Sequence, residues 1–438
     1  MEFIQTEQLY SLFLQHPAVS TDTRTITPGC IFFALKGGNF NGNRFAKDAL
    51  EKGAAYAVID EAEFVSGEQT LLVPDVLKAL QDLARHHRVE LGKKGLKVFG
   101  LTGSNGKTTT KELLSRVLAQ KFRTLYTQGN LNNHIGVPLT LLQLNDSHEM
   151  AVIEMGANHQ GEIAELCAIA LPGFGLITNV GLAHLEGFGG PEGVLKGKSE
   201  LFAHLESAQG TSFVLADDPR LLERSQRLKR VTYGTRGTAD VNGTLTEADP
   251  FVCFAWEAKN GARHEIRTQL VGAYNLPNLV AACAAGNYFG ISAEKIGEAL
   301  SSYTPSNNRS QAETRGTNRL ILDCYNANPS SMAAAIDNMA AMEAEKKMLV
   351  LGDMFELGES SAEEHQRVVD RIAEKLPGAV TLLVGKNFAV TRDGFGAVRL
   401  PDADAAVEWL KAHLPVHTLV LIKGSRGMKM ERCGEVIF

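Results

Sequence analysis

Residues 101–114 read LTGSNGKTTTKELL and lie between an apolar run, KVFGLT, and an apolar helical stripe that begins at Leu113. A glycine-rich turn between a strand and a helix lets backbone N–H groups close around phosphate oxygens, and the helix adds its positive end. Within the turn, Lys107 supplies a charge for the phosphates and Thr108 a hydroxyl for Mg²⁺. The stretch therefore predicts a phosphate loop that binds ATP. Its candidate ATP-binding residues are Thr102, Gly103, Ser104, Asn105, Gly106, Lys107, Thr108 and Thr109.

The loop departs in one position from the full pattern G-x-x-x-x-G-K-[ST], which needs glycine where this chain has Leu101. The alternative interpretation is a glycine turn that caps a helix beside a surface lysine. The strand before the loop and the helix after it favour the phosphate loop. Because such a loop serves kinases, ligases, motors and switches equally well, the use made of the phosphate must be inferred from other residues.

The composition is that of an ordinary globular protein. Of 438 residues, 44% are hydrophobic and 21% are charged, and the formal net charge is −6. Because there is no basic excess to neutralise phosphates, nucleic acid is excluded as the main partner. The six cysteines are scattered without a C-x-x-C pair, which is typical of reduced thiols rather than of a disulfide frame or a zinc site.

The N-terminus, MEFIQTEQLYSLFLQ, starts acidic and has no basic region before its apolar residues, so we predict no secretory signal. No uninterrupted apolar run approaches the ~20 residues that a membrane span needs. The sequence therefore favours a cytoplasmic protein without a membrane span.

Strand-like runs that lead into polar or glycine turns recur along the chain and predict an α/β fold in three domains. Residues 1–84 predict a small α/β domain, residues 85–303 a central domain with a parallel sheet around the phosphate loop, and residues 304–438 a Rossmann-like α/β domain. The last domain has no G-x-G-x-x-G, but its predicted strands run into polar residues, which are Asp323, Asp353, Lys386 and the pair Ser425 and Arg426. Ligands of open α/β sheets bind beyond the carboxyl ends of the strands.

Four further residues follow predicted strands or border a predicted helix. Glu154 ends the strand AVIE and could bind the Mg²⁺ that bridges the phosphates, with a solvated acid as the alternative. His184, in NVGLAHLEGFGG, is either a ligand or a structural histidine. Lys196 and Lys198, in PEGVLKGKSELF, lie beside an apolar helix, where a solvated lysine pair is the simpler interpretation.

Taken together, the motifs resemble those of the Mur ligase family over nearly the whole chain. In order, they are TGSNGKTTTKE, GNLNNHIGVPLTLL, AVIEMGANHQGEI, ITNVGLAHLEGFG, KGKSELF, NLPNLVAA, NNRSQ, DCYNANPSSM, LGDMFELG and KGSRGMKME. Within the family, the asparagine run at 130–133, YNANP and GDMFELG resemble the member that takes a dipeptide as the incoming amine.

The resemblance implies how the terminal phosphate is used. Members of the family use ATP to phosphorylate a carboxylate, and an amine then attacks the acyl phosphate, leaving an amide, ADP and phosphate. Two Mg²⁺ ions are implied, because charge must be neutralised where one anion attacks another. The implied substrates are UDP-N-acetylmuramoyl-tripeptide and D-alanyl-D-alanine, in cytoplasmic peptidoglycan precursor synthesis, and the implied assembly is a monomer.

The resemblance also implies catalytic and metal-binding roles for residues identified above. Lys107 matches the lysine at the β- and γ-phosphates, and Thr108 and Glu154 match the ligands of the first metal ion. His184 resembles the ligand of the second metal ion. Lys198, by its place before SELF, resembles the lysine that relatives carry as a carbamate formed with CO₂. That reaction needs a neutral amine, which partial burial favours.

The nucleotide side of the site is implied by two more segments. Asn275 and Asn278, at i and i+3, resemble the asparagines near the adenine. Many relatives have histidine where this chain has Tyr274, and Asn278 could instead cap or pack within its helix. Arg309 resembles a residue that reaches the nucleotide phosphates from the third domain, and Asp323 the carboxylate that holds the ribose hydroxyls. Both imply that the last domain closes over ATP and excludes water.

The first domain resembles the uridine diphosphate platform of these ligases. Thr23, Arg24 and Lys36 are candidates for contacts with the base or the pyrophosphate. The stretch 41–43 reads NGN where relatives have D-G-H, and a plain β-turn is the alternative there.

Two sets of residues are candidates for binding the rest of the substrates. The candidates for binding near the sugar and phosphates are Asn130, Asn132 and Asn133. A turn-forming polar cluster is the alternative interpretation of these three residues. In the third domain, for the dipeptide and the acceptor peptide, the candidates are Asn326, Asn328, Ser425 and Arg426. An arginine suits a carboxylate because its fork binds bidentately.

Two other functions remain open at this point. A folylpolyglutamate synthase-like ligase would use the same acyl phosphate on another acceptor, but it gives no reason for the uridine platform or for DCYNANP. An ATP-gated binding protein would use the loop as a switch, but it needs neither a second-metal lysine nor a three-domain cleft. The sequence leaves undecided whether the third residue of the tripeptide is diaminopimelate or lysine.

Overall fold

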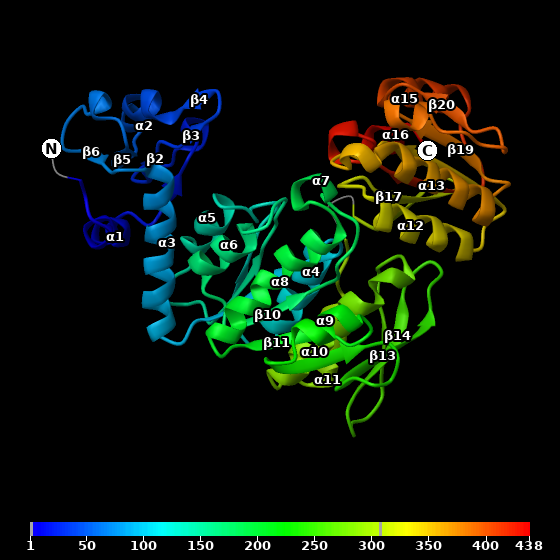
Figure 1. Cartoon of the computed structure of the whole chain (residues 1–438), viewed down its shortest axis with the longest axis horizontal. Helices are drawn as coiled ribbons and strands as arrows, with labels where there is room; N and C mark the ends of the chain where they lie inside the picture. Colours follow the sequence, from blue (N-terminus) through cyan, green and yellow to red (C-terminus); the bar gives the residue numbers. More distant parts are fainter. Residues whose placement is uncertain (1–2, 306–308) are drawn as a thin grey trace.

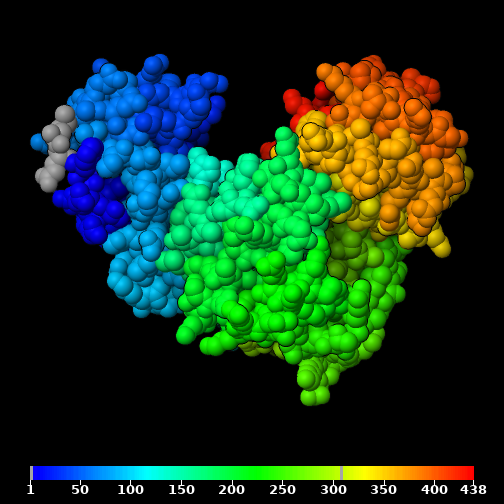
Figure 2. All heavy atoms as spheres, viewed as in Figure 1, coloured from blue at the N-terminus to red at the C-terminus, as the bar shows by residue number. Residues whose placement is uncertain are grey.

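The computed structural model describes residues 3–305 and 309–438, which fold as three α/β lobes (Figure 1). Asn307 and Asn308 of the NNRSQ motif lie outside the described residues. The space-filling view in Figure 2 shows the N-terminal and C-terminal lobes standing apart on the central lobe, with a wide hollow between them. The predicted three-domain α/β class is confirmed.

The N-terminal lobe is built on a four-stranded parallel sheet in the order β1-β2-β5-β6. Side chains alternate across β2, so Phe32 joins one apolar cluster while Ile31 and Phe33 join another. The elements are α1 (Thr6–Gln15), β1 (Val19–Ser20), β2 (Ile31–Phe33), the hairpin strands β3 (Lys36–Gly37) and β4 (Phe40–Asn41), α2 (Ala46–Glu51), β5 (Tyr56–Ile59) and β6 (Thr70–Leu72).

Helix α3 (Val76–Lys93) joins this lobe to the central one. Its N-cap is Asp75, whose side chain accepts the backbone N–H of Lys78. The helix contacts α1 and β2 on one side and α5 and α6 of the central lobe on the other. Residue 84, where the sequence analysis divides the first two domains, therefore lies inside one continuous helix that both lobes share.

The central lobe contains a nine-stranded sheet in the order β15-β14-β13-β12-β11-β10-β7-β9-β8. The strands from β13 to β8 are paired in parallel, whereas β14 and β15 extend the sheet as an antiparallel ribbon that the sequence analysis did not identify. The elements are β7 (Lys97–Thr102), α4 (Lys107–Ala119), β8 (Thr124–Tyr126), α5 (Gly136–Leu141), β9 (Met150–Glu154), α6 (Glu162–Ala170), β10 (Phe174–Ile177), α7 (Leu185–Phe188), α8 (Pro191–Ser207), β11 (Thr211–Leu215), α9 (Pro219–Arg224), β12 (Lys229–Gly234), β13 (Val241–Glu247), β14 (Cys253–Ala258), β15 (His264–Arg267), α10 (Leu276–Tyr288) and α11 (Ala293–Ser301).

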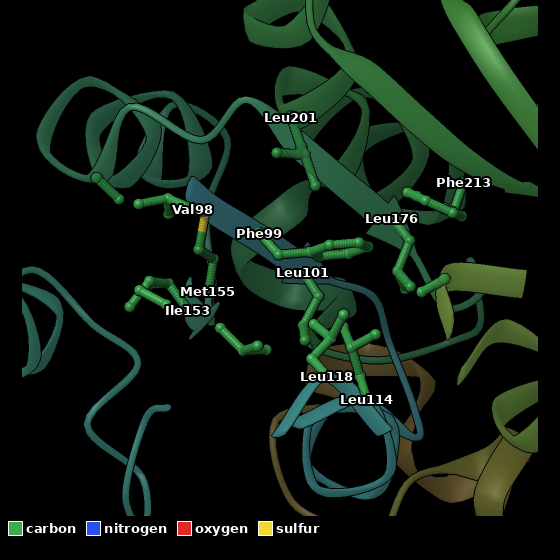
Figure 3. Packing of buried hydrophobic residues seen from close by; sticks show 14 of the residues in the cluster. Val98, Phe99, Leu101, Leu114, Leu118, Ile153, Met155, Leu176, Leu201 and Phe213 are labelled. Atoms are coloured by element: carbon green, nitrogen blue, oxygen red, sulfur yellow. The ribbon is translucent and has the colours of Figure 1, made fainter. Parts of the chain in front are cut away.

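Strand β7 lies between β10 and β9 in this sheet, and the phosphate loop follows its carboxyl end. Its apolar side chains are fully buried against α4 on one face and α6 and α8 on the other (Figure 3). Leu114 and Leu118 of α4, one helical turn apart, both reach this core. The packing therefore fixes the strand and the helix on either side of the loop.

We expect Phe99→Ala to destabilise the central lobe. Phe99 is fully buried, and its ring centroid lies 5.1 Å from that of Phe213. Removing a buried phenylalanine side chain costs about 3–5 kcal/mol, because contacts are lost and a cavity remains. Denaturant unfolding measures the loss, and Phe3→Ala, at a side chain that is 46% exposed, serves as the control with little change.

The C-terminal lobe contains a six-stranded sheet in the order β16-β17-β21-β18-β19-β20. All its pairs are parallel except β16 with β17, so β16 begins at the same edge at which the other strands end. The elements are β16 (Gln311–Arg315), β17 (Asn318–Asp323), α12 (Pro329–Ala341), β18 (Lys346–Gly352), α13 (Ser361–Lys375), β19 (Val380–Val384), α14 (Lys386–Ala389), β20 (Val398–Leu400), α15 (Ala403–Ala412), β21 (Thr418–Lys423) and α16 (Glu431–Glu435).

Candidate active site

A cavity of about 910 Å³ lies between the central and C-terminal lobes. It is lined by the phosphate loop, the asparagine segment after β8, the end of β9 and the segment that contains His184 on the central side. On the other side it is lined by the segments that follow β17 and β21. The site residues that line it are Ser104, Asn105, Gly106, Lys107, Thr108, Thr109, Asn130, Asn132, Asn133, Glu154, His184, Asn275, Asn278, Arg309, Asp323, Asn326, Asn328, Ser425 and Arg426.

The phosphate loop has the backbone that its glycines predict. Gly103 has φ +147°, and a Cβ there would lie 2.0 Å from Thr178 Oγ1, so no other residue fits without movement. Gly106 has φ +76° and precedes the first turn of α4. Lys107 Nζ donates hydrogen bonds to the carbonyls of Gly103 (2.8 Å) and Ser104 (3.2 Å). The lysine is thus folded over its own loop, where incoming phosphates can take its donors.

Burial lowers the pKa of the Lys107 ammonium to about 8, against the opposing effect of the Glu154 charge. A polyphosphate bound in the loop would bring negative charge next to this group and restore its preference for the charged form. The buried Lys107 charge therefore favours the binding of an anion in the loop.

Glu154 and Thr108 form a pair that fits Mg²⁺. Thr108 Oγ1 lies 3.0 Å and 3.2 Å from the two carboxylate oxygens of Glu154, which is buried at the end of β9. Asn132 Nδ2 donates to the same carboxylate at 2.9 Å. Within residues 3–305 and 309–438, no group of three or more His, Cys, Asp or Glu side chains converges as a metal site. Two protein oxygens suit Mg²⁺, because this ion keeps waters and substrate phosphates as its other ligands.

Lys198 is buried in α8 behind the cavity wall and does not line the cavity. Its Nζ donates to the carbonyl of Ala157 at 3.1 Å and lies 4.8 Å from the centre of the Phe188 ring. Burial, and next the charge of Lys107, lower the pKa of the Lys198 amine well below its usual range. The interpretation as a solvated lysine therefore holds for Lys196, which is exposed, and not for Lys198.

His184 lies at the boundary between the lobes. It has a left-handed backbone (φ +53°), and its Nδ1 lies 2.5 Å from a carboxylate oxygen of Glu356 in the GDMFELG segment. The two lobes are also joined by a hydrogen bond from Asn328 Nδ2 to Asn105 Oδ1 (2.7 Å) and one from the Leu182 N–H to a serine hydroxyl at the start of α12 (3.1 Å). The C-terminal lobe therefore already touches the phosphate loop.

On the nucleotide side, the structure brings the predicted asparagines to the loop. Asn278 lies against Gly106, where an added Cβ would approach its side-chain oxygen to 2.9 Å, and it donates to Asn275 Oδ1 at 3.0 Å. Asn275 also donates to the carbonyl of Val271. Tyr274 donates to or accepts from Ser310 at 2.8 Å, a contact that links the central lobe to the segment leading into β16.

Two residues that the sequence analysis missed stand among the predicted ones in the C-terminal lobe. Lys423 is buried at the end of β21 and pairs with Asp323 at 2.5 Å. The guanidinium groups of Arg309 and Arg426 both lie over the ring of Tyr325. They stand in the motifs KGSRGMKME and DCYNANPSSM, but a lysine inside an apolar strand and a tyrosine in a turn carry no chemical signal by themselves.

Asp353, by contrast, has a structural role. It is buried, and its carboxylate accepts the backbone N–H groups of Asn387 and Phe388 at the start of α14. Lys386 is exposed, and neither residue lines the cavity. Of the polar residues predicted after these strands, those after β17 and β21 therefore reach the site.

The candidates of the N-terminal lobe are not brought to this cavity. Arg24 is exposed and holds the carboxylate of Asp22 at 2.6 Å. Lys36 Nζ lies 3.1 Å from buried Asp60, and the hydrogen bond to this carboxylate raises the pKa of the lysine. Thr23, next to Arg24, begins a short 3₁₀ turn. That these residues bind the uridine diphosphate end of the substrate stays a prediction.

Among the helices of the described residues, none combines the length and the apolar character of a transmembrane segment.

Comparison with known proteins gives matches along most of the chain. Residues 17–88 match the Mur ligase family catalytic domain, residues 101–286 the Mur ligase middle domain, and residues 308–426 the Mur ligase glutamate ligase domain. The UDP-N-acetylmuramoyl-tripeptide–D-alanyl-D-alanine ligase of Bacillus subtilis is 35% identical over 428 residues, which cover 94% of this chain and 91% of the relative.

Two solved structures are similar over almost their whole length. A crystal structure of MurF from Acinetobacter baumannii has a TM-score of 0.87 and 33% identity, and covers 96% of this chain and 93% of that one. The MurF ligase of Thermotoga maritima in complex with ADP also has a TM-score of 0.87, with 28% identity and 97% of each chain covered.

Proposed function

We infer the reaction from one premise: the chain belongs to the Mur ligase family. It is an ATP-dependent ligase that forms a carbon–nitrogen bond between D-alanyl-D-alanine and UDP-N-acetylmuramoyl-tripeptide, a step of peptidoglycan synthesis. The observation that carries this function is the agreement of sequence and fold over more than nine-tenths of the chain with proteins of that name.

The reaction proceeds through an acyl phosphate. The tripeptide carboxylate attacks the terminal phosphorus of ATP, the bond from that phosphorus to the bridging oxygen breaks, and ADP leaves. The dipeptide amine then attacks the acyl carbon and an amide forms. Phosphate leaves with the electron pair of the broken carbon–oxygen bond and takes the proton that the amine loses. This order is needed because a carboxylate is a poor electrophile until it carries a good leaving group.

The residues of the cavity divide this work between the two lobes. Lys107 and the backbone of its loop bind the phosphates of ATP, and Arg309 approaches them from the C-terminal side. Thr108 and Glu154 would hold Mg²⁺, which supplies charge neutralisation between the reacting anions. His184 would serve a second ion. Water is excluded when the C-terminal lobe closes over the cavity.

The rest of the proposal concerns the substrates and the compartment. Thr23, Arg24 and Lys36 bind the uridine diphosphate end, and Asn130, Asn132 and Asn133 bind the sugar and phosphates. The dipeptide and the acceptor peptide are bound by Asn326, Asn328, Ser425 and Arg426. All six cysteines are free and buried, which supports a reducing compartment such as the cytoplasm. We expect the protein to act as a monomer.

We expect phosphate release from ATP to require both UDP-N-acetylmuramoyl-tripeptide and D-alanyl-D-alanine. A coupled assay with each substrate omitted in turn measures this dependence, and competition between the diaminopimelate and lysine tripeptides identifies the third residue. Release with glutamate and a folate, or release without any acceptor, would favour one of the two other functions. The appearance of AMP instead of ADP would refute the acyl phosphate.

A further inference from the structure

Two arginines contact one tyrosine ring at the edge of the cavity. The guanidinium carbon of Arg309 lies 3.5 Å from the centre of the Tyr325 ring, and that of Arg426 lies 5.0 Å from it. Arg426 Nη1 also donates a hydrogen bond to the Tyr325 hydroxyl at 3.2 Å. All three residues line the cavity. We call this arrangement the Arg–Tyr–Arg stack.

The sheet topology explains why three residues so far apart in the sequence meet. Strands β16, β17 and β21 are neighbours in that order, and β16 runs antiparallel to the other two. The start of β16 therefore lies at the same edge as the ends of β17 and β21. Arg309 precedes β16, Tyr325 follows β17 and Arg426 follows β21, so the tyrosine occupies the middle position.

Neither arginine is neutralised by a carboxylate of the described residues. Among the described residues, no carboxylate lies within 4.0 Å of the guanidinium group of Arg309 or of Arg426, and Arg309 Nε is buried without an acceptor there. The aromatic face is thus the main partner that holds each cation in place. Two guanidinium groups at fixed spacing suit two anionic groups of bound ligands.

We propose that Tyr325 is a positioning residue that sets the spacing between the nucleotide-side cation, Arg309, and the acceptor-side cation, Arg426. The identity of the two anions, a nucleotide phosphate and the dipeptide carboxylate, rests on the proposed function. The stack itself rests only on the geometry. Because both arginines contact the same ring, its removal should weaken the binding of both the nucleotide and the dipeptide.

The experiment compares Tyr325→Leu with Tyr325→Phe. Losing the ring should raise the Kd for ADP and the KM for D-alanyl-D-alanine, each by about 5- to 30-fold, which is the range for a desolvated cation–π contact. The phenylalanine variant keeps the ring and loses only the hydroxyl that Arg426 contacts. It should leave ADP binding within about twofold and raise only the dipeptide KM, by about two- to tenfold.

A double-mutant cycle tests whether the tyrosine acts through the arginine. We expect Arg309→Ala to weaken ADP binding and Tyr325→Leu to add little to it, because the ring then has no cation to hold. Trp409→Leu is the control, since this half-buried aromatic stacks on His413 in the same lobe and away from the cavity. It should change stability without changing either binding constant.

The results separate this inference from the proposed function. Additive effects of the Arg309 and Tyr325 changes on ADP binding, or a Tyr325→Leu protein whose ADP and dipeptide constants both stay within twofold, would overturn the stack. ADP binding is measured without any acceptor. A protein that needs Tyr325 for ADP binding but shows no dipeptide-dependent phosphate release would retain the stack and refute the proposed acceptor.

Discussion

Lys107→Ala should reduce phosphate release by about 10³-fold or more, because a cation aimed at the transferred phosphoryl group contributes on that scale. Among the described residues, the lysine donates only to two loop carbonyls and forms no ion pair, so its removal breaks no salt bridge there. Removing a buried cation also removes a desolvation cost, and we therefore expect the variant to fold at least as stably as the parent. Steady-state phosphate release and thermal unfolding measure the two effects.

Lys111 provides the matched control for this variant. It lies one turn further along α4, is also buried, and donates to the carbonyl of Thr127 at 2.7 Å rather than facing the cavity. Lys111→Ala should lower stability and leave the KM for ATP nearly unchanged. If Lys107→Ala turned over like the parent while Lys111→Ala did not, the phosphate site would have been misplaced by one helical turn.

The phosphate loop could be predicted from the sequence because its signal is local. Its glycines, lysine and threonine stand within eight consecutive residues, and the strand and helix beside it show ordinary apolar patterns. Strand-end Glu154 was found for the same reason, since β9 pairs with β7 and so ends beside the loop. Local pattern and sheet order together predicted that these residues lie side by side, as they do in the structure.

Long-range contacts could not be predicted in this way. Tyr325 and Lys423 take their roles from neighbours about a hundred residues away, which no periodicity encodes. The ribbon from β13 to β15 was missed because β13 has four consecutive exposed residues and only a weak alternation of burial. The boundary between the N-terminal and central lobes could not be located because it falls within helix α3. A continuous apolar stripe along this helix gives no break in the sequence pattern.

The sequence also left open whether the Lys198 amine carries a carbamate, and the structure bears on this question. A buried amine with a lowered pKa is neutral more often than a surface lysine, and a neutral amine attacks CO₂. The nitrogen–carbon bond forms, one carbon–oxygen π pair becomes the carboxylate charge, and the amine proton leaves to water. We propose this carbamate because the product is an anion next to the Lys107 charge, where an ammonium is disfavoured.

Lys198→Ala should lower ligase activity by about 10²–10³-fold, the scale for losing one preorganised charged group at a reaction centre. A short carboxylate such as acetate should restore part of it, because it can enter the space that the side chain leaves and supply the missing anion. Native mass spectrometry at high bicarbonate should show the mass of one CO₂ on the parent protein and none on the variant.

The exposed neighbour Lys196 gives the comparison that makes this result specific. Lys196→Ala removes a lysine from the same helix but not from the buried position, so it should keep full activity and the CO₂ adduct. A fully active parent with a bare amine at Lys198 would contradict the carbamate directly. Loss of activity in Lys198→Ala that no carboxylate restores would mean that the ammonium itself, or the packing of α8 against Phe188, is what the reaction needs.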